Sequence, residues 1–393
     1  MLAPLYVLSL NIGSSSLKFA LYALDEVESR LATGAVESVG SADSRLWIAH
    51  AAHHRRDVPG KFPDAHAAVR AIFQMLDAHG CPAPMAVGHR LVHGGPDHFA
   101  PEQVDAELIE TLRSLIPFAP LHLPAEVDCI DAVAAHFPGL PQVVCFDTAF
   151  HRHMPEIAQR FPLPRALWDD GIHRYGFHGL SYEYIVDCVG ATALGRAVIA
   201  HLGNGASLAA VRDGQSVDTT MGFTPTGGLM MSTRSGDLDP GVLLYLLATG
   251  RYDDDALVHI VNHESGLLGV SGISADMQTL LAQCSREPRA AQAVAMFCYH
   301  VRKHVGAFAA VLDGLDTVVF TGGIGERAAA VRWEVCSGLA HLGIRLDPQR
   351  NADDNAVISA PDSSCTVRVI PTDEDLMIAR HTRRVLASLR APD

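Results

Sequence analysis

Apolar segments of strand length alternate with a short polar turn near the start of the chain. Leu5–Leu10 is aliphatic, Asn11–Ser16 is small and polar, and Leu17–Tyr22 is largely apolar again. A short apolar run bounded by turn residues is typical of a buried strand. The pattern therefore predicts a hairpin with a glycine-serine turn.

The same pattern returns half a chain later. Residues 197–200 and 208–211 are apolar, and residues 201–207 form a second turn of small residues. In both turns a glycine precedes a Ser-Leu pair at nearly equal spacing. This repetition indicates an internal duplication of two similar α/β domains, with a chance likeness of short glycine motifs as the alternative.

Each of these turns joins two strands, so neither opens a helix as dinucleotide-binding and Walker A loops do. Backbone N–H groups and hydroxyls, with Lys18 beside the first turn, suit a phosphate ligand. A plain polar hairpin is the alternative interpretation of the first turn.

Helical and strand periods predict most of the remaining elements. A strand that ends in a turn is expected at 85–95. Further strands are expected at 142–146, 316–320 and 365–370. Helices are expected at 64–80, 103–115, 125–136, 181–190, 241–250, 253–263, 289–312, 327–340 and 376–389.

One long segment, residues 219–240, follows neither period. It contains four glycines and two prolines, and then Arg234. A structureless loop of this length is usually functional or disordered, and its apolar residues, such as Met230 and Met231, argue against disorder. It is interpreted as a packed active-site loop that holds Arg234.

Length and charge restrict the class of protein. A chain of 393 residues is too long for one ordinary core, so two domains are expected. The net charge of −14 argues against generic binding to nucleic acid or to an anionic membrane. An anionic substrate would therefore need a local cationic pocket.

The cysteines and the chain start indicate a cytoplasmic protein. The eight cysteines are scattered without a CxxC pair, and several lie in apolar runs, which is typical of reduced core residues. The N-terminal segment lacks the features of a signal peptide, and no apolar run is long enough to span a bilayer.

Three polar residues stand out by their positions. Arg90 lies in the apolar strand at 85–95, where an arginine is costly unless it is paired or faces an anion; a buried salt bridge is the alternative. Asp147 follows a strand end, the place where ligands bind in α/β sheets. Glycines near His178 allow close backbone approach, which favours function over a structural histidine.

A glycine-rich turn, Thr321–Glu326, follows a predicted strand and leads into a predicted helix. Helix N-termini favour anions, so this arrangement suits a nucleotide. The end of the last strand carries three carboxylates, Asp373–Asp375, which suggest magnesium beside phosphate loops, with helix N-capping as the alternative.

Two histidine pairs have spacings that metal sites use. His151 and His153, and His300 and His304, lack an evident further ligand. They are therefore interpreted as structural or surface residues.

Taken together, the motifs resemble the acetate kinase family, in the family's order and over about residues 5–385. The residues that carry the resemblance are Asn11–Lys18, Gly88–Gly95, Phe146–Phe150, Tyr175–Gly179, His201–Gly205, Met221–Pro225, Thr233–Pro240, Thr321–Glu326 and the acidic end of the last strand.

The resemblance implies an α/β fold with duplicated ribonuclease H-like (actin-like ATPase) domains and an interdomain cleft. Residues 1–147 with about 375–393 would form the carboxylate side, and residues 148–374 the nucleotide side. It also implies a cytoplasmic homodimer, with no nucleic-acid or membrane partner. Such an enzyme transfers phosphate reversibly between ATP and acetate, giving ADP and acetyl phosphate, with Mg²⁺ or alternatively Mn²⁺.

The resemblance also assigns site residues. The catalytic residues would be Asp147, His178 and Arg234. The acceptor would bind to Arg90 in an apolar pocket of Val92, Leu121, Phe177 and Pro225. The nucleotide would bind to Lys18, His201, Leu202, Gly203, Asn204, Gly205, Asp276, Met277, Gln278, Gly322, Gly323, Ile324, Gly325 and Glu326, and the metal to Asn11 and Glu374.

The chemistry of the reaction agrees with these roles. A carboxylate nucleophile is already ionised at neutral pH and needs no general base. Phosphoryl transfer relies on positioning and charge stabilisation, which two arginines, a histidine and magnesium supply. Asp147 would orient Arg90 or Arg234. Asp147 as a covalent phosphoryl carrier ranks lower, because a single in-line transfer needs no intermediate.

Some positions depart from the family's usual pattern. Leu123 stands where an asparagine is common, and Leu180 and Tyr182 replace a threonine and a histidine. Gln278 and Arg327 replace an arginine and an asparagine near the nucleotide, which leaves the purine preference open.

Two other functions remain open at this point. A propionate or butyrate kinase differs by methylenes worth only about 1–3 kcal/mol each in a pocket. A non-catalytic nucleotide-binding regulator would be expected to lack Arg90, Asp147, His178 or Arg234, and all four are present. The direction of the reaction in the cell depends on metabolite levels.

Overall fold

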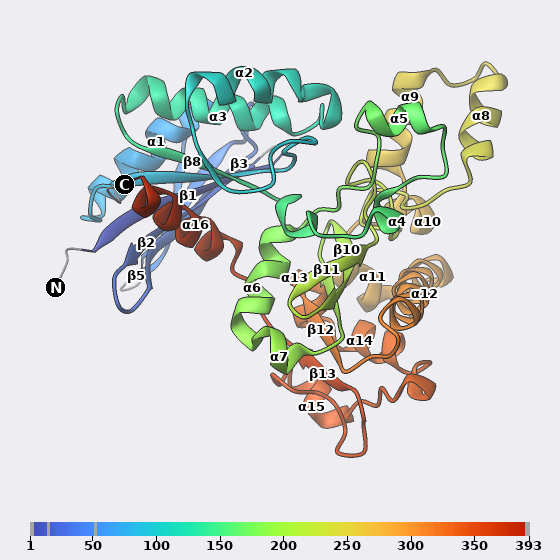
Figure 1. Ribbon diagram of the computed structural model, residues 1–393. Coiled ribbons are helices and arrows are strands. Elements are labelled where there is room, and N and C mark those ends of the chain that lie inside the picture. The colour runs from blue at the N-terminus through green and yellow to red at the C-terminus, as the bar shows by residue number, and fades with distance from the viewer. Residues whose placement is uncertain (1–3, 14–15, 51–52, 390–393) are drawn as a thin grey trace. The chain divides into compact units, whose positions relative to one another are not determined.

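The chain folds into two compact units, one of residues 1–149 with 373–393 and one of residues 150–372. The structure is a computed structural model that describes residues 4–13, 16–50 and 53–389 (Figure 1). The division lies next to the sequence-based boundaries at 147 and about 375. No helix among the described residues is long and apolar enough to cross a membrane.

The first unit contains a mixed sheet in the order β5-β4-β3-β2-β1-β6-β8-β7. Strands β1 to β5 form an antiparallel meander, β6 and β8 run parallel to β1, and β7 is antiparallel to β8. The strands are β1 (Leu5–Ile12), β2 (Ser16–Leu24), β3 (Ser29–Glu37), β4 (Arg45–His50), β5 (His53–Pro59), β6 (Ala86–Leu91), β7 (Glu102–Gln103) and β8 (Gln142–Phe146).

Helices cover both faces of this sheet (Figure 1). Alternate residues of β1 point to opposite faces: Leu8 and Leu10 pack with α1 and α3, and Val7 packs with α16. The helices are α1 (Ala65–Ala78), α2 (Ala106–Ser114), η1 (Ile116–Phe118), α3 (Leu123–His136) and α16 (Glu374–Ser388).

The second unit repeats the central part of the first. Its sheet has the order β11-β10-β9-β12-β13, with an antiparallel β9-β10-β11 meander and with β12 and β13 parallel. The strands are β9 (Ala197–Leu202), β10 (Ala206–Arg212), β11 (Gln215–Thr219), β12 (Thr317–Thr321) and β13 (Thr366–Val369). The first unit has the same arrangement in β3-β2-β1-β6-β8, so the predicted duplication is confirmed.

The helices of the second unit lie before β9, between β11 and β12, and after β12, with the long α12 in the middle group. They are η2 (Ala149–His151), α4 (Glu156–Gln159), α5 (Arg165–Asp169), α6 (Gly179–Val189), α7 (Ala191–Leu194), α8 (Pro240–Ala248), α9 (Asp254–His259), η3 (Ile260–Glu264), α10 (Gly266–Ser271), α11 (Met277–Gln283), α12 (Pro288–Val311), α13 (Gly322–Arg327), α14 (Ala329–Cys336), η4 (Ala340–Leu342) and α15 (Pro348–Ala352).

Both predicted hairpins are confirmed, with Asn11 opposite Lys18 in the first and His201 opposite Ser207 in the second. Part of the first turn, residues 14–15, lies outside the described residues. The cysteines are free, and six of the eight are buried, as predicted for core thiols.

Strands β3, β4 and β5 of the first unit were not predicted. Residues 29–59 form β3, β4 and β5. β4 and β5 carry the exposed arginines Arg45, Arg55 and Arg56, which hide the two-residue period. Gly34 in β3 also weakens the strand signal; a Cβ there would lie 2.5 Å from the Phe19 ring, so only glycine lets this ring cover the strand.

The helix predicted at 327–340 was wrong in its start and its continuity. A helix begins at Gly322, inside the glycine turn, and it ends at Ala328 before α14 starts. Thr321 is its extended N-cap residue, and Gly322 has a φ of +74°, which favours glycine. The predicted helix 253–263 likewise changes at Ile260 into the wide π-turn η3.

Candidate functional site

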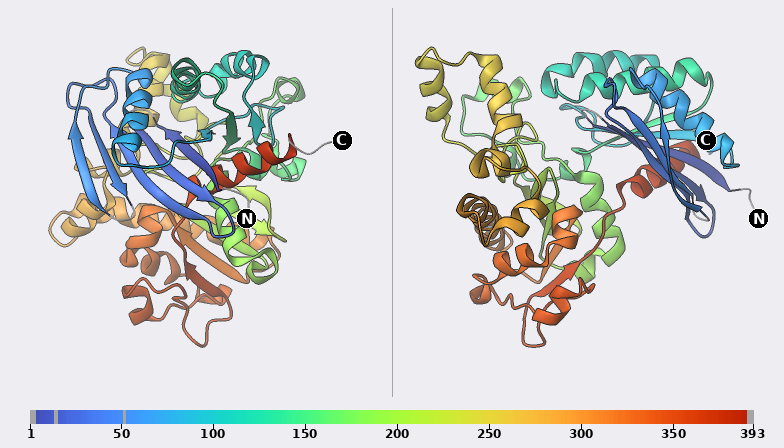
Figure 2. Two further views of the ribbon diagram at one scale, coloured as in Figure 1. Left: turned by 90° about the vertical axis from the view of Figure 1, so that its left-hand side faces the viewer. Right: turned by 180° about the vertical axis from the view of Figure 1, so that it is seen from behind.

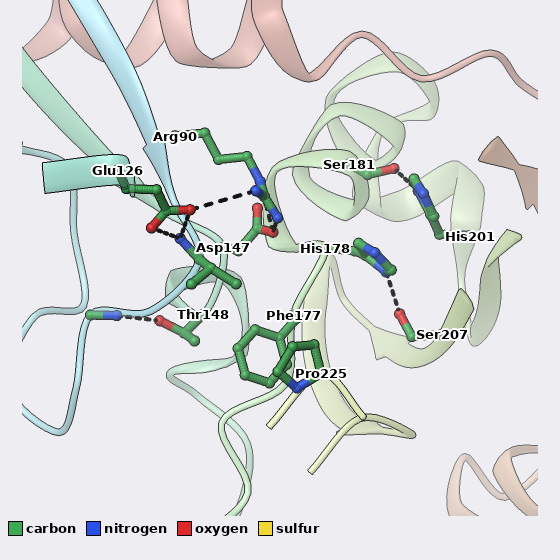
Figure 3. A network of polar contacts seen from close by, with 12 residues as sticks. Arg90, Glu126, Asp147, Thr148, Phe177, His178, Ser181, His201, Ser207 and Pro225 are labelled. Carbon is green, nitrogen blue, oxygen red and sulfur yellow. Dashed lines mark hydrogen bonds and ion pairs between the residues drawn. The ribbon is translucent and has the colours of Figure 1, made fainter. Parts of the chain in front are cut away.

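In the first unit, Arg90 and Asp147 lie at the carboxyl ends of adjacent parallel strands. Arg90 in β6 is paired with Cys145 in β8, so Asp147 follows two residues beyond that position. The Arg90 Nε and Nη2 atoms donate to Asp147 Oδ2 at 3.0 and 2.5 Å (Figure 3). The buried salt bridge considered for Arg90 is therefore present, and its partner is the predicted catalytic aspartate.

This pair is buried unequally. The Asp147 side chain is 1% exposed, whereas that of Arg90 is 15% exposed. Burial alone lowers the pKa of Arg90, but Asp147, Glu126 and Glu374 together raise it above the usual value. The buried Asp147 Oδ1 atom has no hydrogen-bond partner among the described residues. Arg90 therefore stays positively charged, and its side chain remains partly exposed.

Glu126, near the start of α3, is a buried carboxylate that the sequence analysis missed. Its two oxygens accept from the Val92 N–H at 3.1 and 3.0 Å, and Oε1 lies 3.8 Å from Arg90 Nη1. Burial raises its pKa to about 8, although Arg90 and the Val92 N–H oppose this shift. Its position four residues before Ile130 and seven before Val133, both fully buried, is the sequence signal that could have identified it.

The acidic residues Asp373–Asp375 at the start of α16 cap this helix and also form a cluster of carboxyl groups. Asp373 is the N-cap of α16 and accepts from the Leu376 N–H, so the capping alternative is confirmed. Glu374 is half-buried near Asp147, Asp375 and Lys18. Burial and then Asp147 raise the pKa of Glu374 to about 7, and burial with Asp373 raises that of Asp375 to about 6.

Of the two predicted metal residues, Asn11 lies opposite Lys18 in the β1–β2 hairpin and Glu374 lies in this cluster. Acidic groups outnumber the cations Arg90 and Lys18 there, and Asp375 Oδ1 is buried without a hydrogen-bond partner among the described residues. This excess of buried negative charge suits a divalent cation. Among the described residues, however, no group of three or more His, Cys, Asp or Glu could hold a metal by itself.

The predicted pocket residues are divided between the units. Val92 is buried after β6 and Leu121 is 43% exposed before α3. In the second unit, Phe177 is buried and its carbonyl lies 3.1 Å from Nε2 of His151, while Pro225 is half-buried in the long loop. Figure 3 labels the two residues of the second unit.

His178 is held by side chains of its own unit. It is the left-handed N-cap residue of α6, with a φ of 60°. Its Nδ1 lies 2.9 Å from the Ser207 hydroxyl, which also contacts the Tyr182 hydroxyl (Figure 3). Its ring stacks on His201, 4.2 Å between centroids, and His201 Nδ1 lies 2.8 Å from the Ser181 hydroxyl.

A backbone position links His178 to Arg234. A Cβ at Gly205 would lie 3.2 Å from His178 Nε2 and 3.7 Å from Arg234 Nη1. Only glycine leaves this space open, so the predicted catalytic histidine and arginine of this unit face the same spot beside the β9–β10 turn.

The segment 219–240 is a packed loop, as predicted. No helix or strand interrupts residues 220–239, and Met221, Leu229, Met230 and Met231 are buried. Arg234 Nη1 donates to the Pro225 carbonyl at 3.3 Å, which ties the predicted transition-state residue to the predicted pocket residue.

The π-turn η3 fastens both sides of this loop. Asn262 Oδ1 accepts from Thr226 at 2.6 Å, and its carbonyl accepts from the Thr233 hydroxyl at 2.8 Å. The neighbouring Val261 carbonyl accepts from the Ser235 N–H at 2.9 Å. The two residues that flank Arg234 are therefore both bonded to η3, and π-turns are frequent at functional sites.

The glycine-rich helix α13 packs its backbone against the end of β9. A Cβ at Gly322 would lie 2.8 Å from the Leu202 carbonyl. The fully buried Arg332 donates to the carbonyls of Gly325 and Glu326 at 2.9 Å. Arg332, which the sequence analysis did not consider, thus closes the carboxyl end of this helix.

The other predicted nucleotide residues differ in what they can offer a ligand. Leu202 and Met277 are buried, so only their backbone groups could contact a nucleotide. Asp276 caps α11 by accepting from the Thr279 N–H at 2.8 Å. Lys18, Asn204 and Gln278 are exposed, and Gly203, Gly323, Ile324 and Glu326 are half-buried.

Comparisons with known protein families and proteins all match acetate kinases. The family model described as "Acetokinase family" matches residues 6–380. A protein named acetate kinase from Rhodopseudomonas palustris is 46% identical over 391 residues, which cover 96% of this chain and 98% of the relative.

Solved structures give the same result. The chain is similar to an acetate kinase of Porphyromonas gingivalis, with 39% identity and a TM-score of 0.88, covering 97% of this chain and all of the other. It is also similar to a propionate kinase of Francisella tularensis, with 34% identity, a TM-score of 0.92 and the same coverage.

Proposed function

The chain belongs to the acetokinase family, and from this premise we propose that it transfers the terminal phosphoryl group of ATP to acetate in a reversible, direct in-line reaction. The products are acetyl phosphate and ADP. Its class, a phosphotransferase with a carboxyl group as acceptor, follows from the family.

The observation that carries the proposal is the state of Arg90. A buried carboxylate, Asp147, fixes the guanidinium through Nε and Nη2, while the side chain stays partly exposed. A planar cation held in this way binds a carboxylate with defined geometry. The acceptor is ionised at neutral pH, so Arg90 has only to position it.

The residues of the second unit supply charge stabilisation in this proposal. Arg234 would bind the oxygens of the transferred phosphoryl group, and His178 would donate to them. The β9–β10 turn and α13 would hold the nucleotide. Asn11 and Glu374 would hold Mg²⁺, which neutralises charge on the nucleotide phosphates when bound. Residues 1–147 with about 375–393 would thus serve the acceptor, and 148–374 the nucleotide.

We also propose that the enzyme is a cytoplasmic homodimer, with α8 in the interface. This helix is apolar on all sides, and none of its residues is buried. A helix of this kind is normally buried. It lies with α9 at the edge of the second unit, away from the sheet (Figure 2). The exposed apolar side chains there are Leu238, Val242, Leu244, Tyr245, Leu247 and Val258.

Sedimentation of the purified protein tests the dimer. Wild type should sediment as a dimer, and Tyr245→Glu should shift it towards monomer. A monomeric wild-type protein would contradict the proposal.

A second candidate, propionate kinase activity, is favoured by the likeness to the propionate kinase structure. Initial rates with acetate, propionate and butyrate, each with ATP and with GTP, distinguish the candidates. We expect the highest kcat/KM with acetate and ATP. A higher value with propionate would favour the second candidate, and no acyl phosphate from any acceptor would contradict both.

A further inference from the structure

Glu126 lies against the acceptor arginine but has no role in the reaction described above. It stands in the first turns of α3 and is 1% exposed. Both of its oxygens bind the backbone N–H of Val92, two residues after Arg90. The carboxylate therefore fixes the backbone immediately after the arginine, as Figure 3 shows.

Arg90 is shared between two buried carboxylates in different ways. Asp147 accepts from Nε and Nη2, whereas Glu126 Oε1 lies 3.8 Å from Nη1, which is longer than a hydrogen bond. Nη1 thus keeps hydrogen-bonding capacity for the oxygen of an incoming anion. If both carboxylates are ionised, the group of three carries one net negative charge and repels that anion.

We propose that Glu126 is a positioning residue that sets the affinity of Arg90 for the acceptor carboxylate. Its oxygens hold the Val92 N–H and so the direction of Arg90. Its charge state determines how much of the positive charge of Arg90 is available to the acceptor. The inference rests on the proposed function, since it assumes that Arg90 binds the acceptor.

The charged groups around Glu126 define the expected pH response. Arg90 and Asp147 face it from the β6 and β8 side, and Glu374 of α16 faces Arg90. On α3 itself, Asp128 is exposed and the pKa of the Cys129 thiol is raised to about 12, so this thiol is neutral.

Among the described residues, the groups that shift the pKa of Glu126 are Arg90, Asp147 and the Val92 N–H, and none of them belongs to α1 or α2. Arg113 of α2 binds Asp131, and His66 of α1 contacts His136, both at later turns of α3.

The direction in which the KM for acetate changes with pH follows from the pKa of Glu126, which is about 8. Below this pH Glu126 is mainly neutral, and Arg90 attracts the acceptor without competition from Glu126. Above it Glu126 becomes ionised and weakens the binding of an anion to Arg90. The KM for acetate should therefore rise as the pH passes from 7 to 9, while acetate itself stays fully ionised.

The experiment compares wild type, Glu126→Gln and Glu126→Ala in acetyl phosphate synthesis at pH 7 and pH 9. Glutamine keeps an oxygen for the Val92 N–H and has no charge. We expect wild type and Glu126→Gln to have similar KM values for acetate at pH 7, and the variant to have an about tenfold lower value at pH 9.

Glu126→Ala should raise the KM for acetate at both pH values, because the Val92 N–H loses its acceptor, and the KM for ATP should change little. Asp128→Asn removes a charge from the same helix at an exposed site, and it should behave as wild type at both pH values.

Two outcomes would overturn the inference. One is a wild-type KM for acetate that stays constant from pH 7 to 9. The other is an equal pH dependence in wild type and Glu126→Gln. The wild-type profile keeps the test decisive even if a variant fails to fold. A wild-type protein that makes no acyl phosphate would instead contradict the proposed function.

Discussion

The two units share one sheet arrangement but use opposite means to build their parts of the site. In the first unit, the carboxyl groups of Asp147, Glu126 and Glu374 surround Arg90. In the second unit, His178 contacts the Ser207 hydroxyl and stacks on His201, and Arg234 donates to the Pro225 carbonyl. The difference is in the loops at the strand ends, since the central five strands have the same order in both units.

This difference determines how each part should respond to mutation. Buried charges interact over several ångströms and change one another's pKa. A change at one residue of the first unit should therefore alter its neighbours and their pH dependence. Neutral hydrogen bonds act over short distances, so changes in the second unit should stay local and independent of pH.

The largest effect is expected for Arg234→Ala in the second unit. Loss of an arginine that stabilises the transferred phosphoryl group lowers kcat by about 10³-fold or more. Steady-state kinetics should show this loss with little change in the KM for ATP. Arg345→Ala, at an exposed ion pair, is the matched control. An unchanged kcat in Arg234→Ala would remove Arg234 from the mechanism.

A smaller loss of activity, measured as kcat/KM for acetate, is expected for Asp147→Asn in the first unit. Arg90 loses the counter-charge that fixes it, and misplacement of a substrate-binding group costs about 10²-fold in kcat/KM for acetate. The pKa of Glu126 should also fall, because Asp147 raises it. Asp131→Asn, at a surface pair, is the control. If the pH dependence of Asp147→Asn matched that of wild type, the charges would not be coupled as described.

Asn262→Ala tests the fastening of the long loop by η3. Because Asn262 bonds Thr226 and Thr233 on both sides of the loop, its loss should let Arg234 move and lower kcat by about tenfold. The effect should be the same at pH 7 and pH 9, unlike the effects in the first unit. His263→Ala, on the same turn but exposed, should retain wild-type kcat. Equal losses in both variants would point to general loosening of η3.

The smallest effect concerns folding stability. The pKa of Glu126 is raised in the folded protein, so its contribution to stability is present at low pH and is lost as the pH rises through about 8. Glu126→Gln should therefore have a Tm a few degrees above wild type at pH 9 and no advantage at pH 5. Calorimetry at both pH values measures this, and an equal difference at both would contradict the raised pKa.

Several features of the site were predictable because they are local in sequence. The two hairpins, the strand before Asp147 and the unusual composition of residues 219–240 each carry their signal within a few neighbouring residues. Glu126 was missed since its importance depends on Arg90, which lies 36 positions earlier and meets it only in the folded unit. Asn262 was missed because a π-turn has no distinct sequence pattern.

The wrong predictions for β4, β5 and α13 also arise because contacts distant in the sequence decide these elements. β4 and β5 carry polar residues that interrupt the apolar pattern, and they join the sheet by pairing, β4 with β3 and β5 with β4. The start of α13 was placed too late, because glycines usually end helices. Here Gly322 is required by the close approach of the Leu202 carbonyl.

The return of the chain to the first unit at residue 373 has a consequence for how the protein forms. Ser9 in β1 donates to the carbonyl of Asp375, 366 residues later, and Tyr22 donates to Asp373. The second unit is one uninterrupted segment, so it can fold during synthesis before α16 emerges. The first unit cannot complete its sheet face until then, and its slow closure should limit the overall folding rate. Glu374 arrives with that last helix, so the acceptor side of the site is completed only after the whole second unit has been synthesised.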